Sequence, residues 1–166
     1  MKRIEIAMLL SLLLLLCACG GPATQEEKSA AKNGQDYTTV LTLPDSVTSE
    51  SLAMLELPNR VQERWRSEDG SIRLVLETMP SNTDVIHTED TETVKIGDGE
   101  GTLYRYAGET IDYPSLDAGA VKGMYKPEPG DLILEWETDG VYCRLFGNLS
   151  REELTETAAS LRVEEN

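Results

Sequence analysis

The chain has 166 residues, with 15 lysine and arginine side chains against 30 aspartate and glutamate side chains, and a formal net charge of −15 at pH 7. Because nucleic-acid binding and flat docking on an anionic membrane both require basic side chains, this composition argues against both kinds of partner. The acidic surface is expected to keep a domain soluble, with weak cation binding as the alternative.

Residues 1–18 have the pattern of a bacterial lipoprotein signal peptide. Lys2 and Arg3 form a positively charged start, and residues 6–16 are an almost unbroken apolar run. The run is too short to span a bilayer, because a spanning helix needs about 20 residues. It ends in Leu-Cys-Ala-Cys-Gly over residues 16–20, which resembles the lipobox of lipoproteins, with Cys19 as the acceptor.

We therefore expect cleavage before Cys19, lipidation of its thiol, and attachment to the extracytoplasmic face of the cell membrane; an uncleaved or a soluble secreted form is the alternative. Residues 19–36 are small and polar without an apolar period, which predicts a flexible tether. Residues 37–166 suffice for a single domain. Cys17 is lost with the leader, so Cys143 has no disulfide partner and packing must stabilise the domain.

After the tether, short β-rich runs separated by turn residues predict antiparallel strands. The predicted strands are residues 37–43, 61–66, 71–79, 92–96, 102–106, 131–137 and 141–146, and residues 49–57 fit either a helical turn or a strand. An Asp-Gly pair at 69–70 predicts a type I′ hairpin that sets Trp65 opposite Leu74 and Arg66 opposite Arg73. The glycine-rich segment 97–101 predicts a plain hairpin turn, since it lacks the pattern of a phosphate or calcium loop.

A second Asp-Gly pair, at 139–140, predicts the last hairpin. This two-residue turn sets Trp136 opposite Cys143 on one face and Glu135 opposite Arg144 on the other, as in a half-solvated sheet. In such a strand a lone Cys143 is expected to be a small buried apolar residue, with a reactive thiol as the alternative.

The end of the chain predicts an amphipathic helix. Ser150 and Glu153 form a capping-box pattern, and Leu154, Ala158 and Leu161 recur at helical spacing. The apolar stripe has nowhere to be buried except against the sheet. We therefore predict an α+β fold, a curved antiparallel β-sheet with an amphipathic C-terminal helix packed on one face.

The order of these elements resembles a known family. Residues 94–104, the tryptophan-bearing hairpin 132–142 and residues 147–161 look like a small β-rich domain of unknown function found in lipoproteins of Gram-positive bacteria and in extracytoplasmic parts of anti-sigma-factor-like proteins. The resemblance covers residues 92–162, and it implies the curved sheet of lipoprotein-carrier and envelope-stress-sensing folds. It supplies no catalytic or ligand residues. An anti-sigma factor needs a cytoplasmic segment before its membrane span. No such segment precedes the predicted signal peptide in this sequence, so we do not expect that function.

Residues typical of an enzyme are scarce. His87 is the single histidine and lies in a polar stretch, which favours a surface residue over a metal ligand or a catalytic base. Trp65 and Trp136 could line a ligand groove, but their phase with neighbouring leucines favours the core. We expect no enzyme activity, no catalytic residues, no metal and no cofactor, and keep an extracellular hydrolase acting on cell-wall or surface substrate as the alternative.

Residues 107–130 are predicted as the longest loop, and long loops in compact domains are often functional. Tyr113, Met124 and Tyr125 make the loop less polar than a linker, so we predict that these three residues bind a ligand. The other interpretation is a cover over the sheet edge. The expected function is therefore a lipid-anchored cell-envelope protein, a non-enzymatic binding or sensing module for an apolar ligand or an envelope partner, with the membrane as a partner through its N-terminal lipid.

Overall fold

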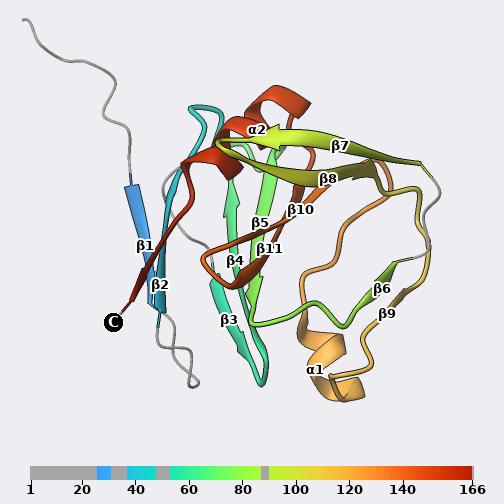
Figure 1. Ribbon diagram of the computed structural model, residues 1–166. Helices are drawn as coiled ribbons and strands as arrows, with labels where there is room; N and C mark the ends of the chain where they lie inside the picture. Colours follow the sequence, from blue (N-terminus) through green and yellow to red (C-terminus); the bar gives the residue numbers. More distant parts are fainter. Residues whose placement is uncertain (1–25, 31–36, 48–52, 87–89, 166) are drawn as a thin grey trace, which may run out of the picture.

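Antiparallel strands make up most of the structure, a computed structural model that describes residues 26–30, 37–47, 53–86 and 90–165. The strands are β1 (Glu26–Ala30), β2 (Tyr37–Thr42), β3 (Ala53–Leu57), β4 (Arg60–Arg66), β5 (Arg73–Met79), β6 (Val85–Ile86), β7 (Thr91–Ile96), β8 (Gly99–Arg105), β9 (Ile111–Asp112), β10 (Leu132–Thr138), β11 (Val141–Gly147) and β12 (Arg162–Glu165). The helices are α1 (Ala118–Gly123) and α2 (Arg151–Ser160) (Figure 1). The predicted signal peptide, the predicted lipid acceptor Cys19 and His87 lie outside the described residues, as do residues 19–25 and 31–36 of the predicted tether.

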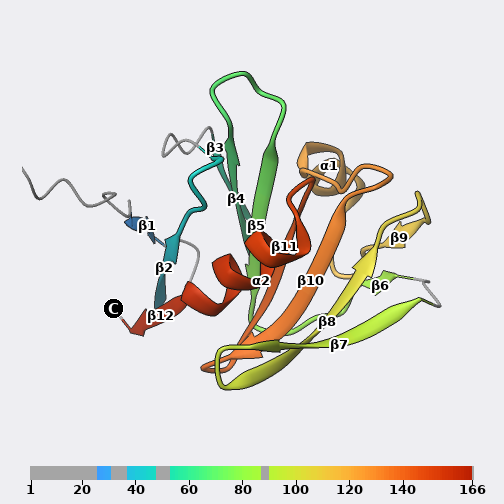
Figure 2. The ribbon, with the colours of Figure 1, turned by 90° about the horizontal axis from the view of Figure 1, so that it is seen from above.

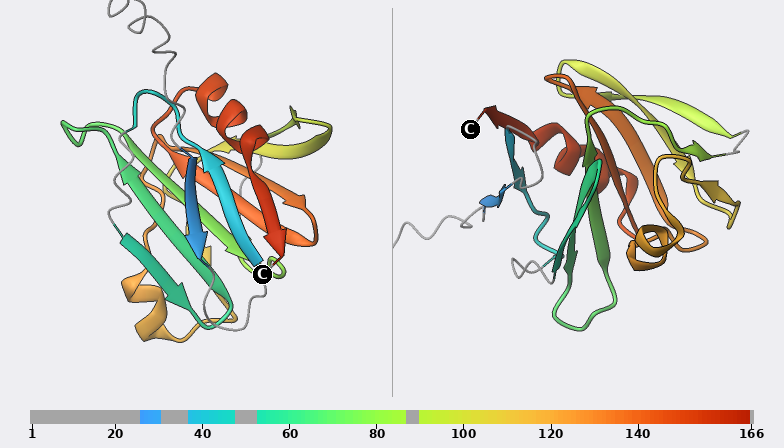
Figure 3. Two further views of the ribbon diagram at one scale, coloured as in Figure 1. Left: turned by 90° about the vertical axis from the view of Figure 1, so that its left-hand side faces the viewer. Right: turned by 90° about the horizontal axis from the view of Figure 1, so that it is seen from below.

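The main sheet is open and has seven strands in the order β3-β4-β5-β11-β10-β8-β7. Helix α2 and a small sheet of β1, β2 and β12 cover one of its faces (Figures 2 and 3). The main hydrophobic core lies between these layers and includes Trp65, Trp136, Leu154 and Leu161. The predicted fold class is confirmed, and both tryptophans are core residues as expected.

The hairpin of β10 and β11 has the predicted turn and register. Residues 139–140 adopt φ angles of 49° and 73°, the left-handed values that a type I′ turn requires. Trp136 lies opposite Cys143. Cys143 is fully buried, and burial raises the pKa of its thiol to about 12, which favours the predicted apolar role over a reactive thiol.

The hairpin of β4 and β5 keeps the predicted register, with Trp65 opposite Leu74, but its turn differs. Of the described turn residues, Gly70 alone has a positive φ, of 71°, whereas a type I′ turn requires two. The Asp69 carboxylate instead accepts hydrogen bonds from the backbone N–H of Ser71 and from hydroxyl groups on both sides of the turn. This side-chain bonding stabilises a conformation other than the predicted one.

Helix α2 begins with the predicted capping box. The Ser150 hydroxyl accepts a hydrogen bond from the backbone N–H of Glu153, whose carboxylate accepts one from the backbone N–H of Ser150. Leu154 and Ala158 are buried on the face of the helix that packs against the sheet, as their spacing predicts. The chain then enters β12, which pairs with β2 and which no sequence pattern predicts.

Two segments have more structure than their composition predicts. β1 pairs with β2, so the structure differs from a flexible tether over Glu26–Ala30; ladder hydrogen bonds join backbone groups and need no apolar side-chain pattern. Residues 107–130 include β9 and α1, which lie with β6 on the side of the sheet away from β2 (Figure 1). Of residues 49–57, which fit a helical turn or a strand by sequence, residues 53–57 form β3, and residues 49–52 lie outside the described residues.

Candidate functional site

A cluster of buried charged side chains lies on the face of the main sheet opposite α2. Arg60 Nη1 is 2.8 Å from Glu77 Oε1, and Arg144 Nη1 is 2.8 Å from Glu77 Oε2. Arg144 Nε donates to Glu135 Oε1 over 2.6 Å. Asp84, from the segment after β5, joins both arginines. We call Arg60, Glu77, Asp84, Glu135 and Arg144 the buried ion cluster.

The prediction of a half-solvated hairpin is wrong for the pair of Glu135 and Arg144. Arg144 is only 2% exposed, and the Glu135 side chain is 15% exposed. The register is as predicted, but residues from the segments 80–86 and 107–130 lie over this face and remove it from water. Burial therefore comes from segments remote in sequence, which hairpin alternation does not reveal.

Asp84 accepts hydrogen bonds from both arginines of the buried ion cluster. Its two carboxylate oxygens lie 2.7 and 2.8 Å from the two terminal nitrogens of Arg60, and Oδ2 also accepts from Arg144 Nη1 over 2.9 Å. Burial by itself would raise the pKa of Asp84, but the hydrogen bonds from both arginines outweigh it and hold that pKa below its usual value. Burial would likewise lower the pKa of Arg144, yet the charges of Glu77 and Glu135 raise it.

A pocket of about 290 Å³ beside this cluster includes Asp84, Glu135, Asn82 and Tyr104 in its lining. Two carboxylates in one pocket are what a glycosidase would need, but its general acid requires a carboxyl group with a raised pKa. The pKa of Asp84 shifts the other way, and Arg144 donates to both carboxylates. Among the described residues, no group of three or more His, Cys, Asp or Glu side chains could hold a metal ion.

The loop over this face is fastened to the sheet by Gln62. The backbone N–H of Tyr125 donates to Gln62 Oε1 over 2.9 Å, and Gln62 Nε2 donates to the carbonyl oxygen of Tyr125 over 3.0 Å. Gln62 Nε2 also lies 3.3 Å from Glu77 Oε1 in the buried ion cluster. The position of Tyr125 is therefore set by a fully buried side chain of the sheet.

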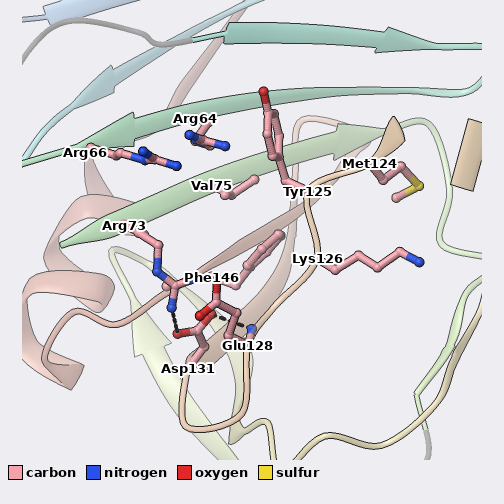
Figure 4. A pocket seen from close by; sticks show the side chains of 11 residues that line it. Arg64, Arg66, Arg73, Val75, Met124, Tyr125, Lys126, Glu128, Asp131 and Phe146 are labelled. Atoms are coloured by element: carbon pink, nitrogen blue, oxygen red, sulfur yellow. Dashed lines mark hydrogen bonds and ion pairs between the residues drawn. The ribbon is translucent and has the colours of Figure 1, made fainter. Parts of the chain in front are cut away.

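Next to Tyr125 is a groove of about 200 Å³, which we call the basic groove (Figure 4). Its lining consists of Arg64, Arg66, Arg73, Val75, Met124, Tyr125, Lys126, Glu128, Asp131, Phe146 and Gly147. The four basic side chains outnumber the two carboxylates, which leaves the lining with a formal charge of +2. In a chain with a net charge of −15, this is a local concentration of positive charge.

The arginines of the basic groove are held in different ways. Arg73 forms ion pairs with Glu128 and Asp131, the latter over 3.0 Å, and all three side chains line the groove. The Arg64 guanidinium lies over the ring of Tyr125, 4.6 Å from its centroid, and beside Arg66 along β4 (Figure 4). Within the described part of the chain, the buried Nε of Arg64 has no hydrogen-bond partner.

Of the three residues predicted to bind a ligand, Met124 and Tyr125 line the basic groove and Tyr113 does not. The Tyr113 ring lies 5.6 Å from the Arg60 guanidinium and 6.0 Å from the Lys126 ammonium group, and burial raises its pKa. Tyr113 therefore covers the buried ion cluster, which is a covering role within the same loop.

The three arginines of the groove are the residues that sequence analysis missed. Arg64 and Arg66 are two positions apart in β4, so they share a face of the sheet, and Arg66 lies opposite Arg73 as predicted. This register brings three like charges together on one face of the sheet. Three like charges on one face of a predicted sheet are the sequence signal that would have indicated an anion site.

A match to one family model covers most of the domain. The model of a domain of unknown function (DUF4367) matches residues 43–161. No curated protein and no solved structure matches the chain. In the described ranges, no helix has both the length and the apolar character needed to cross a bilayer.

Proposed function

The chain belongs to the DUF4367 family, and we infer its function from the geometry of the basic groove because the domain that defines this family is one of unknown function. We propose that the protein is a non-enzymatic binding or sensing module of the bacterial cell envelope. In this proposal, lipid on Cys19 holds the domain at the extracytoplasmic face of the membrane, as in the lipoproteins that its first residues resemble. The basic groove is where it takes its ligand or its envelope partner.

The observation that carries the proposal is the composition of the groove. Its basic side chains surround an apolar floor made by Val75, Phe146 and the buried Met124. Ligand sites combine an apolar surface with a few fixed polar groups, and this groove has both. We therefore propose a ligand that is apolar in one part, as the sequence predicts, and anionic in another part that matches the arginines.

Photocrosslinking in cells tests this function. A photoreactive residue at position 125 should capture one discrete envelope component, and the capture should weaken when Arg64 and Arg66 are both replaced by Gln. The same photoreactive residue at position 54 is the matched control, because Met54 is an exposed apolar residue of β3. Equal products from positions 54 and 125, or no product from position 125, would contradict a binding role for the groove.

A further inference from the structure

We propose that the basic groove binds a phosphate monoester, with the phosphate against Arg64 and Arg66 and the esterified carbon group against the apolar floor. This inference rests on the proposed binding function and adds the chemistry of the ligand.

The charge of the groove favours a dianion. The lining has a formal charge of +2, from Arg64, Arg66, Arg73 and Lys126 against Glu128 and Asp131. A phosphate monoester carries between about −1.5 and −2 charges at pH 7, whereas a carboxylate carries one. A phosphate monoester therefore comes closer to neutralising the groove than a single carboxylate does.

The geometry of Arg64 favours phosphate as well. Its planar guanidinium lies over the Tyr125 ring, and Tyr125 is fixed by Gln62, so the orientation of the N–H donors is set before a ligand arrives. The Nε of Arg64 is buried without a partner among the described residues. An arginine fork matches the spacing of phosphate oxygens, and a donor already oriented loses less entropy on binding.

The size of the groove limits what it holds. At about 200 Å³ it is smaller than the sites of drug-sized ligands, which are roughly 300 to 1,000 Å³. Only the phosphate and an adjoining small group fit inside. Val75 and Phe146 line the groove (Figure 4) and form an apolar floor for that group. The rest of the ligand extends into solvent.

Two sources provide this chemistry, a soluble phosphate ester and a lipid with a phosphate monoester headgroup. The experiment measures calorimetric binding of the full chain to phenyl phosphate, inorganic phosphate, benzoate and a short-chain phosphatidic acid below its micelle concentration. We expect phenyl phosphate to bind more tightly than inorganic phosphate, and benzoate to bind at least about tenfold more weakly than phenyl phosphate, because charge-assisted hydrogen bonds are lost. Phosphatidic acid binding more tightly than phenyl phosphate identifies a lipid headgroup; equal or weaker binding identifies a soluble ester.

Three variants make the result specific. Arg64→Gln should weaken phenyl phosphate binding by about tenfold or more, and Arg64→Lys, which keeps the charge but loses the planar fork, should also weaken it. Arg162→Gln removes the same charge from the exposed surface of β12 and should leave affinity unchanged. An unchanged thermal midpoint shows that each variant is folded, and Arg66→Gln replaces Arg64→Gln if that variant unfolds.

Benzoate binding as tightly as phenyl phosphate, or unchanged affinity in the arginine variants, would overturn the proposal. Failure of the phosphate proposal is distinguishable from failure of the binding function. If phosphates do not bind but position 125 still captures a discrete component, only the ligand chemistry is wrong. If neither phosphate binding nor capture from position 125 is observed, the proposed binding function is wrong as well.

Discussion

Asp84 and Arg60 meet in a two-pronged contact, with both carboxylate oxygens within 2.8 Å of the two terminal guanidinium nitrogens. Neither side chain is exposed to solvent. Because Asp84 follows β5 and Arg60 begins β4, the contact fastens the segment after one strand to the face of its neighbour. Removing the Asp84 carboxylate would take a buried ion-pair partner from Arg144 and, among the described residues, would leave Arg60 with Glu77 alone.

The first prediction concerns this contact. Asp84→Asn should lower the free energy of unfolding by about 3 to 5 kcal/mol, because Arg60 and Arg144 then lose a shared carboxylate in a buried site. Urea unfolding measures the change. The matched control is Asp112→Asn, an exposed carboxylate in β9, which should change stability by less than about 0.5 kcal/mol. An equally small effect of Asp84→Asn would mean that the cluster does not stabilise the fold.

The second prediction is a pH dependence. The pKa of Asp84 is lowered from 3.8 in the folded protein, so its ionised form stabilises the fold above pH 3.8, and this contribution is lost as the pH falls below that value through the folded pKa. Urea midpoints measured between about pH 5 and pH 2 should fall more steeply for the natural chain than for Asp84→Asn. Parallel curves would show that Asp84 does not titrate as its contacts require.

The third prediction concerns a close backbone approach in the main sheet. A Cβ atom at Gly101 would lie 2.8 Å from the carbonyl oxygen of Glu135 and would also meet Ile96. Gly101→Ala should therefore cost about 1 to 3 kcal/mol of stability, as overpacking does. Gly99→Ala, in the same strand, is the control, because its Cβ would have its nearest neighbour at 3.7 Å. Similar thermal midpoints for the two variants would argue against this packing of β8 on β10.

The fourth prediction tests the proposed anchor. Cys19→Ala should abolish metabolic labelling with fatty acid and leave the precursor uncleaved, because Cys19 is the proposed lipid acceptor. Any Cys19→Ala chain that is nevertheless cleaved should be absent from the membrane fraction, because it has no acyl chains and stable attachment needs more than one. Cys17→Ala is the matched control and should keep its label. Persistent labelling of Cys19→Ala would show that the lipid is elsewhere or that the motif is not used.

Local patterns predicted the elements that local interactions determine. The turn at 139–140 and the cap formed by Ser150 and Glu153 depend on neighbours within a few residues, so their sequence signals are sufficient. Strand alternation also placed Trp65 and Trp136 correctly in the core, since burial of one face of a sheet follows from a period of two.

The buried ion cluster and the basic groove could not be predicted in this way. Asp84 begins a polar stretch that looks like a surface loop, and its burial depends on two arginines separated by 84 positions in the sequence but joined through the sheet. The groove likewise joins Arg64 of β4 to Tyr125 of a remote loop. Such contacts arise from the tertiary arrangement, which hydrophobic periodicity does not encode.

The double hydrogen bond between Gln62 and Tyr125 determines how the loop opens. Because the Tyr125 amide donates to a buried side chain rather than to water, its proton exchanges with deuterium only when the loop leaves the sheet. Gln62 Nε2 also lies 3.3 Å from Glu77 Oε1, so the side chain that holds the loop is itself in contact with the buried ion cluster. Because this one side chain joins the wall of the basic groove to the buried ion cluster, we expect the two to open together, with the Tyr125 amide exchanging as slowly as the strands that it covers.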